Sequence, residues 1–262
     1  MNTIKVVTFN ARCVYFDKTG KGDGIRSFVF RAGYIYDKIQ NEMPDIIMFQ
    51  EFFKEHLDIM KKLLCEYEFI GHFRNEDFTG EGVYTAVRKD KMQVLGFDSY
   101  WLSPTPYVSG SRYANQSECP RTCLTVKVRD IDSGKIFRVL NTHLDHESDE
   151  ARILGIQQIL KSACEDTEKD NIPFIFGGDF NAMPDSKTIA YCNDFDKIKL
   201  FDITENIDVT FHDWGKRRVK IDYIYVTKKF KDKVKSVCVW DDEIYGMYLS
   251  DHYPVSAEFF ME

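Results

Sequence analysis

Four short motifs with polar side chains are spread over almost the whole chain. They are TFNA with Asn10, FQE with Glu51, GGDFNA with Asp179 and Asn181, and SDHYP with Asp251 and His252. Each motif adjoins a short apolar run, which is typical of a strand that delivers a polar side chain to the edge of a sheet. Oxygen ligands and a histidine at four strand ends indicate a site that binds a hard metal ion and hydrolyses a phosphoester.

The candidate metal ligands offer only oxygen atoms. Glu51 follows the apolar run DIIMFQ, and Asn10 and Asp251 lie at two other strand ends. Mg²⁺ and Mn²⁺ prefer such ligands, and Mg²⁺ needs only one or two carboxylates besides water. A single acid at a strand end more often forms a salt bridge, but the other motifs favour a metal site. We therefore predict Mg²⁺ or Mn²⁺ as the cofactor.

Asp179 and Asn181 are two residues apart, so their side chains point the same way in extended backbone. A carboxylate beside an amide can orient a water nucleophile or a phosphate oxygen. The alternative is a simple turn, because Gly, Asp and Asn are common turn residues. We interpret the pair as functional.

Two histidines complete the predicted site. His252 follows Asp251, and Asp222 lies in the apolar run IDYIYV, where a buried carboxylate needs a partner. A histidine oriented by an aspartate is the usual arrangement for acid–base catalysis or for binding a phosphate oxygen. His143, in LNTHLDH, can donate to the phosphate and stabilise developing negative charge. The alternative for His143 is a hydrogen-bonded core histidine.

The string NTHLDH also resembles the zinc signature H-x-H-x-D-H of the metallo-β-lactamase superfamily. Asn141 occupies the position of the first histidine, however, so a dinuclear zinc site lacks one of its essential ligands. This alternative is therefore disfavoured.

Composition narrows the class of protein. The chain has 262 residues, 44% of them apolar, and a formal net charge of −7. It contains no apolar stretch of the roughly 20 residues that a membrane helix needs, and its seven scattered cysteines suggest a reducing, cytoplasmic setting. The acidity favours a small or short phosphorylated substrate over duplex nucleic acid, although a basic strip at 216–235 can attract phosphate. We expect no membrane and no protein partner.

The hydrophobic pattern predicts more strands than helices, with no linker between them, and hence one α+β domain over residues 1–262. Residues 10–25 and 103–120 are predicted loops. The predicted helices cover about 26–42, 53–64, 148–165 and 186–193. The predicted strands cover about 4–9, 45–50, 67–73, 83–88, 92–100, 122–130, 136–143, 173–180, 221–227, 234–240 and 253–260.

Taken in order, these motifs resemble those of the endonuclease/exonuclease/phosphatase family, whose members have the DNase I-like fold. The resemblance covers residues 6–258. It implies a four-layer α/β/β/α sandwich with two packed mixed sheets, and hydrolysis of a phosphoester by water with Mg²⁺ or Mn²⁺. WLSPTP, CPRT and THLDH are similar to a broad bacterial group of the family.

The family resemblance also implies roles for individual residues. Glu51 would be the principal metal ligand, with Asn10 and Asp251 nearby. Asp179 and Asn181 would position or deprotonate the attacking water. His252, held by Asp222, would bind the phosphate or act as the acid–base group, and His143 would stabilise the phosphate from the other side. The general base is either Asp179 or the Asp222–His252 pair.

The substrate is the most open question. Arg121 in CPRT falls where the family often carries a phosphate-facing polar residue. Phe211, His212 and Trp214 in TFHDW are candidates for stacking a base or sugar, and the alternative is that they anchor the loop. We expect either a small phosphorylated metabolite or nucleotide, or a short or single-stranded nucleic acid. A non-catalytic binding module is disfavoured because every expected catalytic position is filled.

Overall fold

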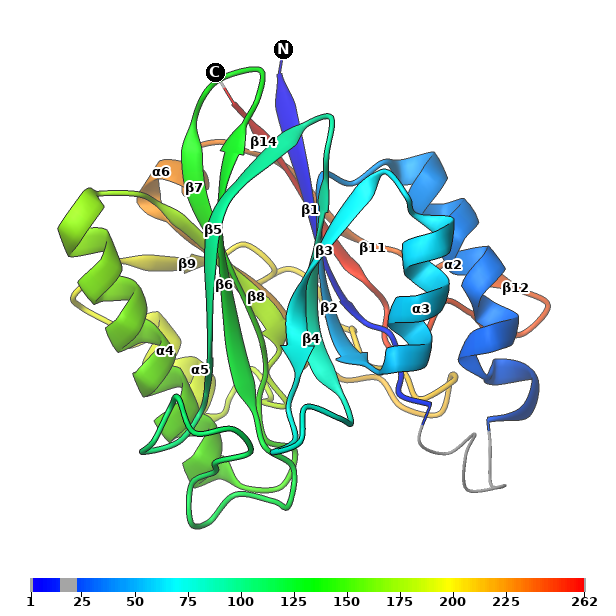
Figure 1. The fold of residues 1–262 in the computed structure, drawn as a ribbon, viewed down its shortest axis with the longest axis horizontal. Helices are drawn as coiled ribbons and strands as arrows, with labels where there is room; N and C mark the ends of the chain where they lie inside the picture. Colours follow the sequence, from blue (N-terminus) through cyan, green and yellow to red (C-terminus); the bar gives the residue numbers. More distant parts are fainter. Residues whose placement is uncertain (1, 15–22, 262) are drawn as a thin grey trace.

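The computed structural model describes residues 2–14 and 23–261, in which two six-stranded sheets pack face to face (Figure 1). The first sheet has the order β11 (Val234–Val239), β14 (Val255–Phe260), β1 (Thr3–Asn10), β2 (Ile46–Phe52), β4 (Gly82–Arg88), β3 (Tyr67–Phe73). The second sheet has the order β5 (Met92–Trp101), β6 (Thr122–Asp130), β7 (Ile136–His143), β8 (Phe174–Asp179), β10 (Asp222–Thr227), β9 (Leu200–Asp202).

Both sheets are mixed, and each contains one parallel pair at its centre. β1 runs parallel to β2, and β7 runs parallel to β8, whereas the other pairs are antiparallel. Central strands have both faces covered, which explains why TIKVVTFN and IIMFQEF read as nearly continuous apolar runs. Parallel neighbours also end at the same edge of a sheet, so the polar residues that follow them lie together.

Helices cover the outer face of each sheet, so that the molecule has four layers (Figure 1). One apolar cluster fills the space between the sheets, with Val6 and Met48 meeting Val126 and Val139. A second cluster packs α2 (Phe28–Glu42) and α3 (Lys54–Leu63) on the first sheet. A third packs α4 (Asp149–Asp170) and α5 (Lys187–Asp194) on the second. The predicted α/β/β/α sandwich is confirmed.

Local signals explain where the helices begin and end. Ser148 and Ser186 cap α4 and α5 by accepting hydrogen bonds from Ala151 N and Ile189 N. α2 ends at Met43, in the left-handed conformation just before Pro44. α4 runs five residues beyond its predicted end at about 165, because Asp170 in its last turn is held by Arg138. No helix in the described ranges is long and apolar enough to cross a membrane.

The short elements were not predicted. They are η1 (Gly24–Arg26), β9, α6 (Lys228–Lys231), β12 (Glu243–Ile244) and β13 (Met247–Tyr248). Such elements contain too few residues for a periodic pattern to be recognised. Half of the loop predicted at 10–25, residues 15–22, lies outside the described residues, whereas the one at 103–120 contains no helix or strand.

Candidate active site

Three predicted site residues lie side by side at one edge of the second sheet. His143 ends β7, Asp179 ends β8 and Asp222 begins β10. In the strand registers, Asp179 is opposite His143 on one side and Asp222 on the other. Backbone pairing alone therefore brings two carboxylates and an imidazole together from positions almost 80 residues apart in sequence.

The first sheet contributes the other half of the site. Asn10 ends β1 opposite Gln50, and Glu51 follows on β2. The pairing of β2 with β4 shifts between Phe49 and Phe52, and Glu51 within this bulge has φ 59°. Left-handed backbone is uncommon for a glutamate and occurs preferentially at functional sites. The bulge turns the Glu51 side chain toward the end of the strand.

Asn10 joins the two halves. Its Nδ2 donates to Glu51 Oε1 at 3.0 Å and to Asp179 Oδ2 at 2.9 Å. Its Oδ1 accepts a hydrogen bond from Arg12 N at 3.0 Å. One amide thus holds together two carboxylates that belong to different sheets.

A network of buried hydrogen bonds joins the two sheets next to the site. Gln50 Nε2 donates to Asn141 Oδ1 at 2.8 Å, and Asn141 Nδ2 donates to Phe49 O and Tyr84 O, each at 3.1 Å. Gln50 and Asn141 are both completely buried. Asn141 is therefore a structural link between the sheets, consistent with the argument against a zinc site at this histidine-rich motif.

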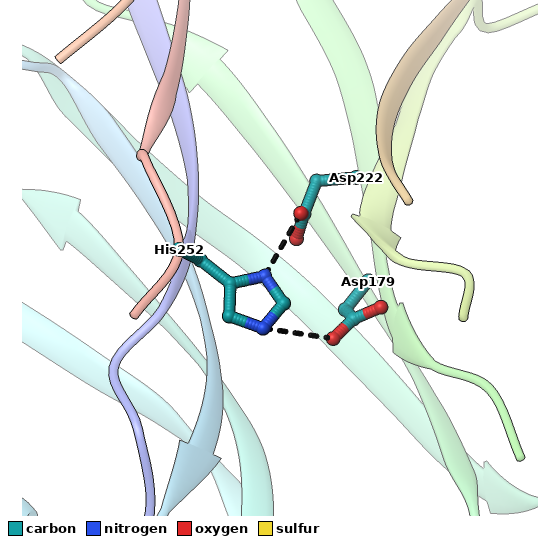
Figure 2. A group of neighbouring side chains, drawn as sticks. All are labelled: Asp179, Asp222 and His252. Carbon is teal, nitrogen blue, oxygen red and sulfur yellow. Dashed lines mark hydrogen bonds and ion pairs between the residues drawn. The ribbon is translucent and has the colours of Figure 1, made fainter. Parts of the chain in front are cut away.

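His252 and Asp222 form the predicted pair (Figure 2). Nδ1 of His252 donates to Asp222 Oδ2 at 2.9 Å, while Nε2 faces Asp179 Oδ2 at 3.8 Å. Burial alone would lower the pKa of His252, but the Asp222 carboxylate and then Asp179 raise this pKa to about 10. His252 is therefore a cation at neutral pH.

Asp179 lies at the centre of the site. Asn181 N donates to its Oδ1 at 2.9 Å, and His143 Nε2 lies 3.5 Å from its Oδ2. Burial, followed by repulsion from Asp222, raises the pKa of Asp179 to about 7. The pKa of His143 is instead well below its usual value, because of burial and then the charge of Arg121. The site thus combines a neutral imidazole, an imidazolium and a carboxylate that ionises near neutral pH.

Glu51 and Asp251 both interact with Arg12. Arg12 Nη1 is 3.3 Å from Asp251 Oδ2. Burial would raise the pKa of Glu51, but Arg12, followed by Asn10 and further neighbours, together lower this pKa to about 2. Burial, with repulsion from Glu51 among its further causes, raises the pKa of Asp251. Two interacting carboxylates next to an asparagine form an oxygen-only donor set, which fits Mg²⁺ or Mn²⁺.

A second group of side chains is also compact enough to hold a cation. Ligand atoms of Asp179, Asp222 and His252 all lie within 4.8 Å of one another. His252 is already hydrogen-bonded through Nδ1, and a protonated imidazole has no lone pair to offer a metal. This group is therefore better suited to acid–base chemistry than to metal binding.

The site lies in a groove of about 1490 Å³. Glu51, Asp179 and His252 line it. The groove is bordered by the start of α3, the hairpin between β3 and β4, and the loop 211–221. These borders add aromatic side chains, with Phe53, Phe78 and Phe211 among them.

Arg121 is buried beside this groove with unused hydrogen-bonding capacity. Its Nη2 donates to His146 Nδ1 at 3.0 Å, but Nε and Nη1 have no partner among the described residues. Burial, followed by repulsion from Arg74, lowers the pKa of Arg121. A buried cation needs an anionic or acceptor partner, so its position supports the prediction that Arg121 binds substrate.

A family comparison is consistent with this arrangement of groups. A model of the endonuclease/exonuclease/phosphatase family matches residues 7–252 of the chain. The chain belongs to this family. Endonuclease/exonuclease/phosphatase proteins hydrolyse phosphoesters, and all the predicted metal-binding and catalytic residues lie within the matched range. No curated protein matches the chain.

Solved structures of the family resemble this one along their full length. The endonuclease/exonuclease/phosphatase protein from Bacteroides vulgatus is 28% identical, with a TM-score of 0.88 and full coverage of both chains. The mannosyl-6-phosphatase Bt3783 from Bacteroides thetaiotaomicron is 26% identical, with a TM-score of 0.83, over 98% of this chain and 100% of its own. The human Nocturnin catalytic domain, 18% identical with a TM-score of 0.75 over 98% of this chain and 93% of its own, shares the fold.

Two residues predicted to bind substrate are placed elsewhere. His212 is buried and stacks on Tyr253, with ring centroids 4.1 Å apart. Trp214 is 8% exposed and packs against the guanidinium groups of Arg26 and Arg31. Neither side chain lines the groove, so both anchor the loop that carries them. Aromatic residues in a short loop have no periodicity that separates an anchor from a substrate contact.

Phe211, the third candidate in TFHDW, does line the groove, and its ring centroid lies 4.7 Å from that of His252. The structure also adds Arg31, which the sequence analysis did not assign to the site. Arg31 is buried and donates to Ala11 O at 3.0 Å and to Leu249 O, which ties together the segments that carry Asn10 and Asp251. An arginine in an amphipathic helix is usually interpreted as a surface charge. The sequence pattern therefore did not indicate a structural role for Arg31.

Proposed function

We propose that the protein is a metal-dependent phosphoesterase that hydrolyses a phosphoester of a small phosphorylated metabolite, such as a sugar phosphate or a nucleotide. The observation that carries this proposal is the convergence of Asn10 and Glu51 from one sheet with His143, Asp179 and Asp222 from the other. All of these groups meet at one end of the sandwich, beside a single groove.

The cation belongs with the oxygen-only donor set. Glu51 and Asp251 would hold Mg²⁺ or Mn²⁺, with Asn10 beside them. When bound, the cation polarises the phosphoryl group and neutralises charge on the departing oxygen. Arg12 lies against the same carboxylates and limits their mutual repulsion.

Asp179 is the general base in this proposal. Its pKa of about 7 matches the requirement that a base be deprotonated yet able to hold a proton near neutral pH. The hydrogen bond from Asn181 N fixes the Asp179 carboxylate, and the Asn181 side chain is itself fixed by donating to Leu144 O at 3.0 Å. Asp179 accepts the proton of the attacking water, whose oxygen forms the new bond to phosphorus.

His252 and His143 bind the phosphoryl oxygens. His252 is a cation whose ring is held by Asp222, and the tilted ring of Phe211 packs beside it. His143 stays neutral and donates a hydrogen bond. Arg121 lines the same groove and contributes its positive charge. Preorganised donors of this kind stabilise the charge that develops as the phosphoester breaks.

Two observations bear on the substrate. A phosphorylated sugar is favoured because Bt3783, a mannosyl-6-phosphatase, resembles this chain over its full length. The second candidate is a short or single-stranded nucleic acid, which is favoured by the size of the groove. At about 1490 Å³ it exceeds the roughly 300–1,000 Å³ of typical small-molecule sites.

The test is a substrate panel of p-nitrophenyl phosphate, bis-p-nitrophenyl phosphate, sugar phosphates, nucleotides and single-stranded oligonucleotides. Each is assayed with Mg²⁺, with Mn²⁺ and with EDTA, for the wild type and for His252→Ala and Glu51→Gln. We expect turnover that EDTA abolishes and that each substitution lowers by at least about 100-fold. Calorimetric titration should show weaker Mn²⁺ binding to Glu51→Gln, and unchanged binding to His252→Ala.

The panel also decides between the two substrates. Fastest turnover of a sugar phosphate supports the metabolite, and fastest turnover of an oligonucleotide supports the nuclease. Turnover that survives both EDTA and His252→Ala would contradict the proposed site. Equal Mn²⁺ affinity for the wild type and Glu51→Gln would instead contradict the assignment of the metal ligands.

A further inference from the structure

The loop between Phe211 and Val219 contains an unusual concentration of positive charge. Lys216, Arg217, Arg218 and Lys220 lie within five residues of a chain whose net charge is −7. Lys220 is buried and pairs with Asp202 at 3.0 Å, and Lys216 lies 4.0 Å from Asp213. Arg217 and Arg218 are exposed and form no ion pair with any residue that the structure describes.

The two unpaired arginines are the ones that line the groove. Arg217 and Arg218 border it together with His252, whereas Lys216 and Lys220 do not. If this basic strip served only solubility, we would expect its unpaired charges to face solvent rather than a binding groove. The position of Arg217 and Arg218 therefore indicates a ligand rather than a solvated face.

The loop holds these arginines in a defined place relative to the catalytic groups. Phe211 and Val219 pair at its base, through Phe211 N to Val219 O at 2.9 Å and Val219 N to Phe211 O at 3.1 Å. Phe211 also pairs with His252, and Arg217 N donates to His212 O at 2.9 Å. The buried rings of His212 and Trp214 anchor the tip. Such anchoring reduces the entropy that a ligand must overcome on binding.

The other arginines that line the groove already have a carboxylate partner or an assigned role. Arg12 lies against Glu51 and Asp251, and Arg74 pairs with Glu81 at 2.6 Å. The scissile phosphate already has His252, His143 and Arg121 beside it in our proposal. Arg217 and Arg218 remain as two cations in the lining of the same groove, and arginine matches phosphate through paired N–H donors.

We infer that Arg217 and Arg218 form a second phosphate subsite, so that the preferred substrate carries another phosphate group beside the one that is hydrolysed. The inference rests on the proposed function and narrows its substrate class. Two sources supply this chemistry: a bisphosphorylated small molecule, or a nucleic acid strand whose neighbouring phosphodiester occupies the subsite.

The test compares ligands that have one phosphate group with related ligands that have two. Mannose 6-phosphate is paired with mannose 1,6-bisphosphate, and a thymidine dinucleotide is paired with the trinucleotide. Dissociation constants are measured by calorimetry in an Asp179→Asn background, so that hydrolysis does not interfere. The variant is Arg217→Gln/Arg218→Gln. Its matched control is Lys61→Gln/Lys62→Gln, two adjacent exposed cations on α3 that change the net charge equally.

We expect the arginine variant to weaken binding of a two-phosphate ligand about tenfold and to change its one-phosphate partner less than about twofold. An effect confined to the bisphosphate identifies a small-molecule substrate, and one confined to the trinucleotide identifies a strand. The control should match the Asp179→Asn parent for every ligand. Added salt should weaken the two-phosphate ligand more steeply than its partner, and the arginine variant should lose that difference.

Two results would overturn the second subsite: equal weakening of both members of each pair, or no weakening of either two-phosphate ligand. Neither result depends on catalysis, because binding alone is measured. Failure of the proposed function is recognised separately, as the absence of metal-dependent turnover of every panel member by the wild-type protein.

Discussion

Burial and charge act differently on the two ionisable residues nearest the reacting water. Burial raises the pKa of Asp179 to about 7, since its carboxylate loses solvent and faces a second carboxylate. Burial lowers the pKa of His252, but the charge and hydrogen bond of Asp222, together with the charges of Asp179 and Asp251, raise it to about 10. Between these two values Asp179 is an anion and His252 is a cation, which is the combination that base catalysis and phosphate binding require.

This combination predicts a bell-shaped pH dependence. Activity should rise with pH through about 7 as Asp179 loses its proton, and should fall near pH 10 as His252 loses its own. Asp222→Asn removes the largest contribution that raises the pKa of His252, so the alkaline limb should move to lower pH. The measurement is kcat/KM against pH for both proteins, and an alkaline limb that stays in place would show that it does not report His252.

At this scale the sequence was informative where a polar residue ends an apolar run. Asn10, Glu51, His143 and Asp179 were predicted from that pattern, and the structure brings all four together. Residues that act from loops or helices had no such pattern. Arg31 was therefore missed. Of the three residues of TFHDW predicted to contact substrate, Phe211 lines the groove, whereas His212 and Trp214 are buried.

Among the elements, β8 lies so close to β7 that a side chain at Gly178 would clash with the β7 backbone. Gly178, which precedes Asp179, has φ 145°, and a Cβ atom there would lie 1.9 Å from the carbonyl oxygen of Thr142 on β7. The close approach of β8 to β7 places Asp179 opposite His143. A glycine at this position thus sets the distance between two catalytic strands.

Gly178→Ala should therefore separate β7 from β8. We expect a loss of about 1–3 kcal/mol in the free energy of unfolding and a clear fall in kcat, because the clash is with backbone that cannot rotate away. Urea unfolding and steady-state kinetics measure the two effects. Gly33→Ala on α2 is the control: no atom lies within 4 Å of its Cβ position, so alanine should stabilise the helix by up to about 1 kcal/mol.

Most strands and helices were predictable because their apolar periodicity is long. β3, β6 and β7 have the predicted bounds, and the two sheets follow from the family resemblance. The end of α4 was predicted too early because its last turn is polar, and polarity alone does not show that Arg138 holds it. The two-residue strands β12 and β13 are too short to be recognised.

For the molecule as a whole, the important contact is the one between the two sheets. The centre of the interface is an apolar cluster, and near the site Gln50 and Asn141 bridge the two sheets with completely buried amides. Asn141 satisfies Gln50 and two backbone carbonyls at once. Buried polar groups are costly when they lose a partner, so this network favours one register between the sheets.

Asn141→Ala should remove three hydrogen bonds from the buried network. We expect the free energy of unfolding to fall by about 3 kcal/mol. Chemical denaturation followed by tryptophan fluorescence measures the change. Asn115→Ala, which removes an exposed amide bonded to Glu150, should change stability by less than about 0.5 kcal/mol. Equal, small effects of both substitutions would show that the network contributes little.

The division of the site between two sheets has a consequence for the protein during its synthesis. His252 is synthesised after every other residue of the proposed site, and β1, which carries Asn10, pairs with β14, which follows His252. A nascent chain therefore lacks the proposed catalytic imidazolium while the other groups of the site have already been made. We expect the site to stay inactive until β14 pairs with β1 and completes the first sheet.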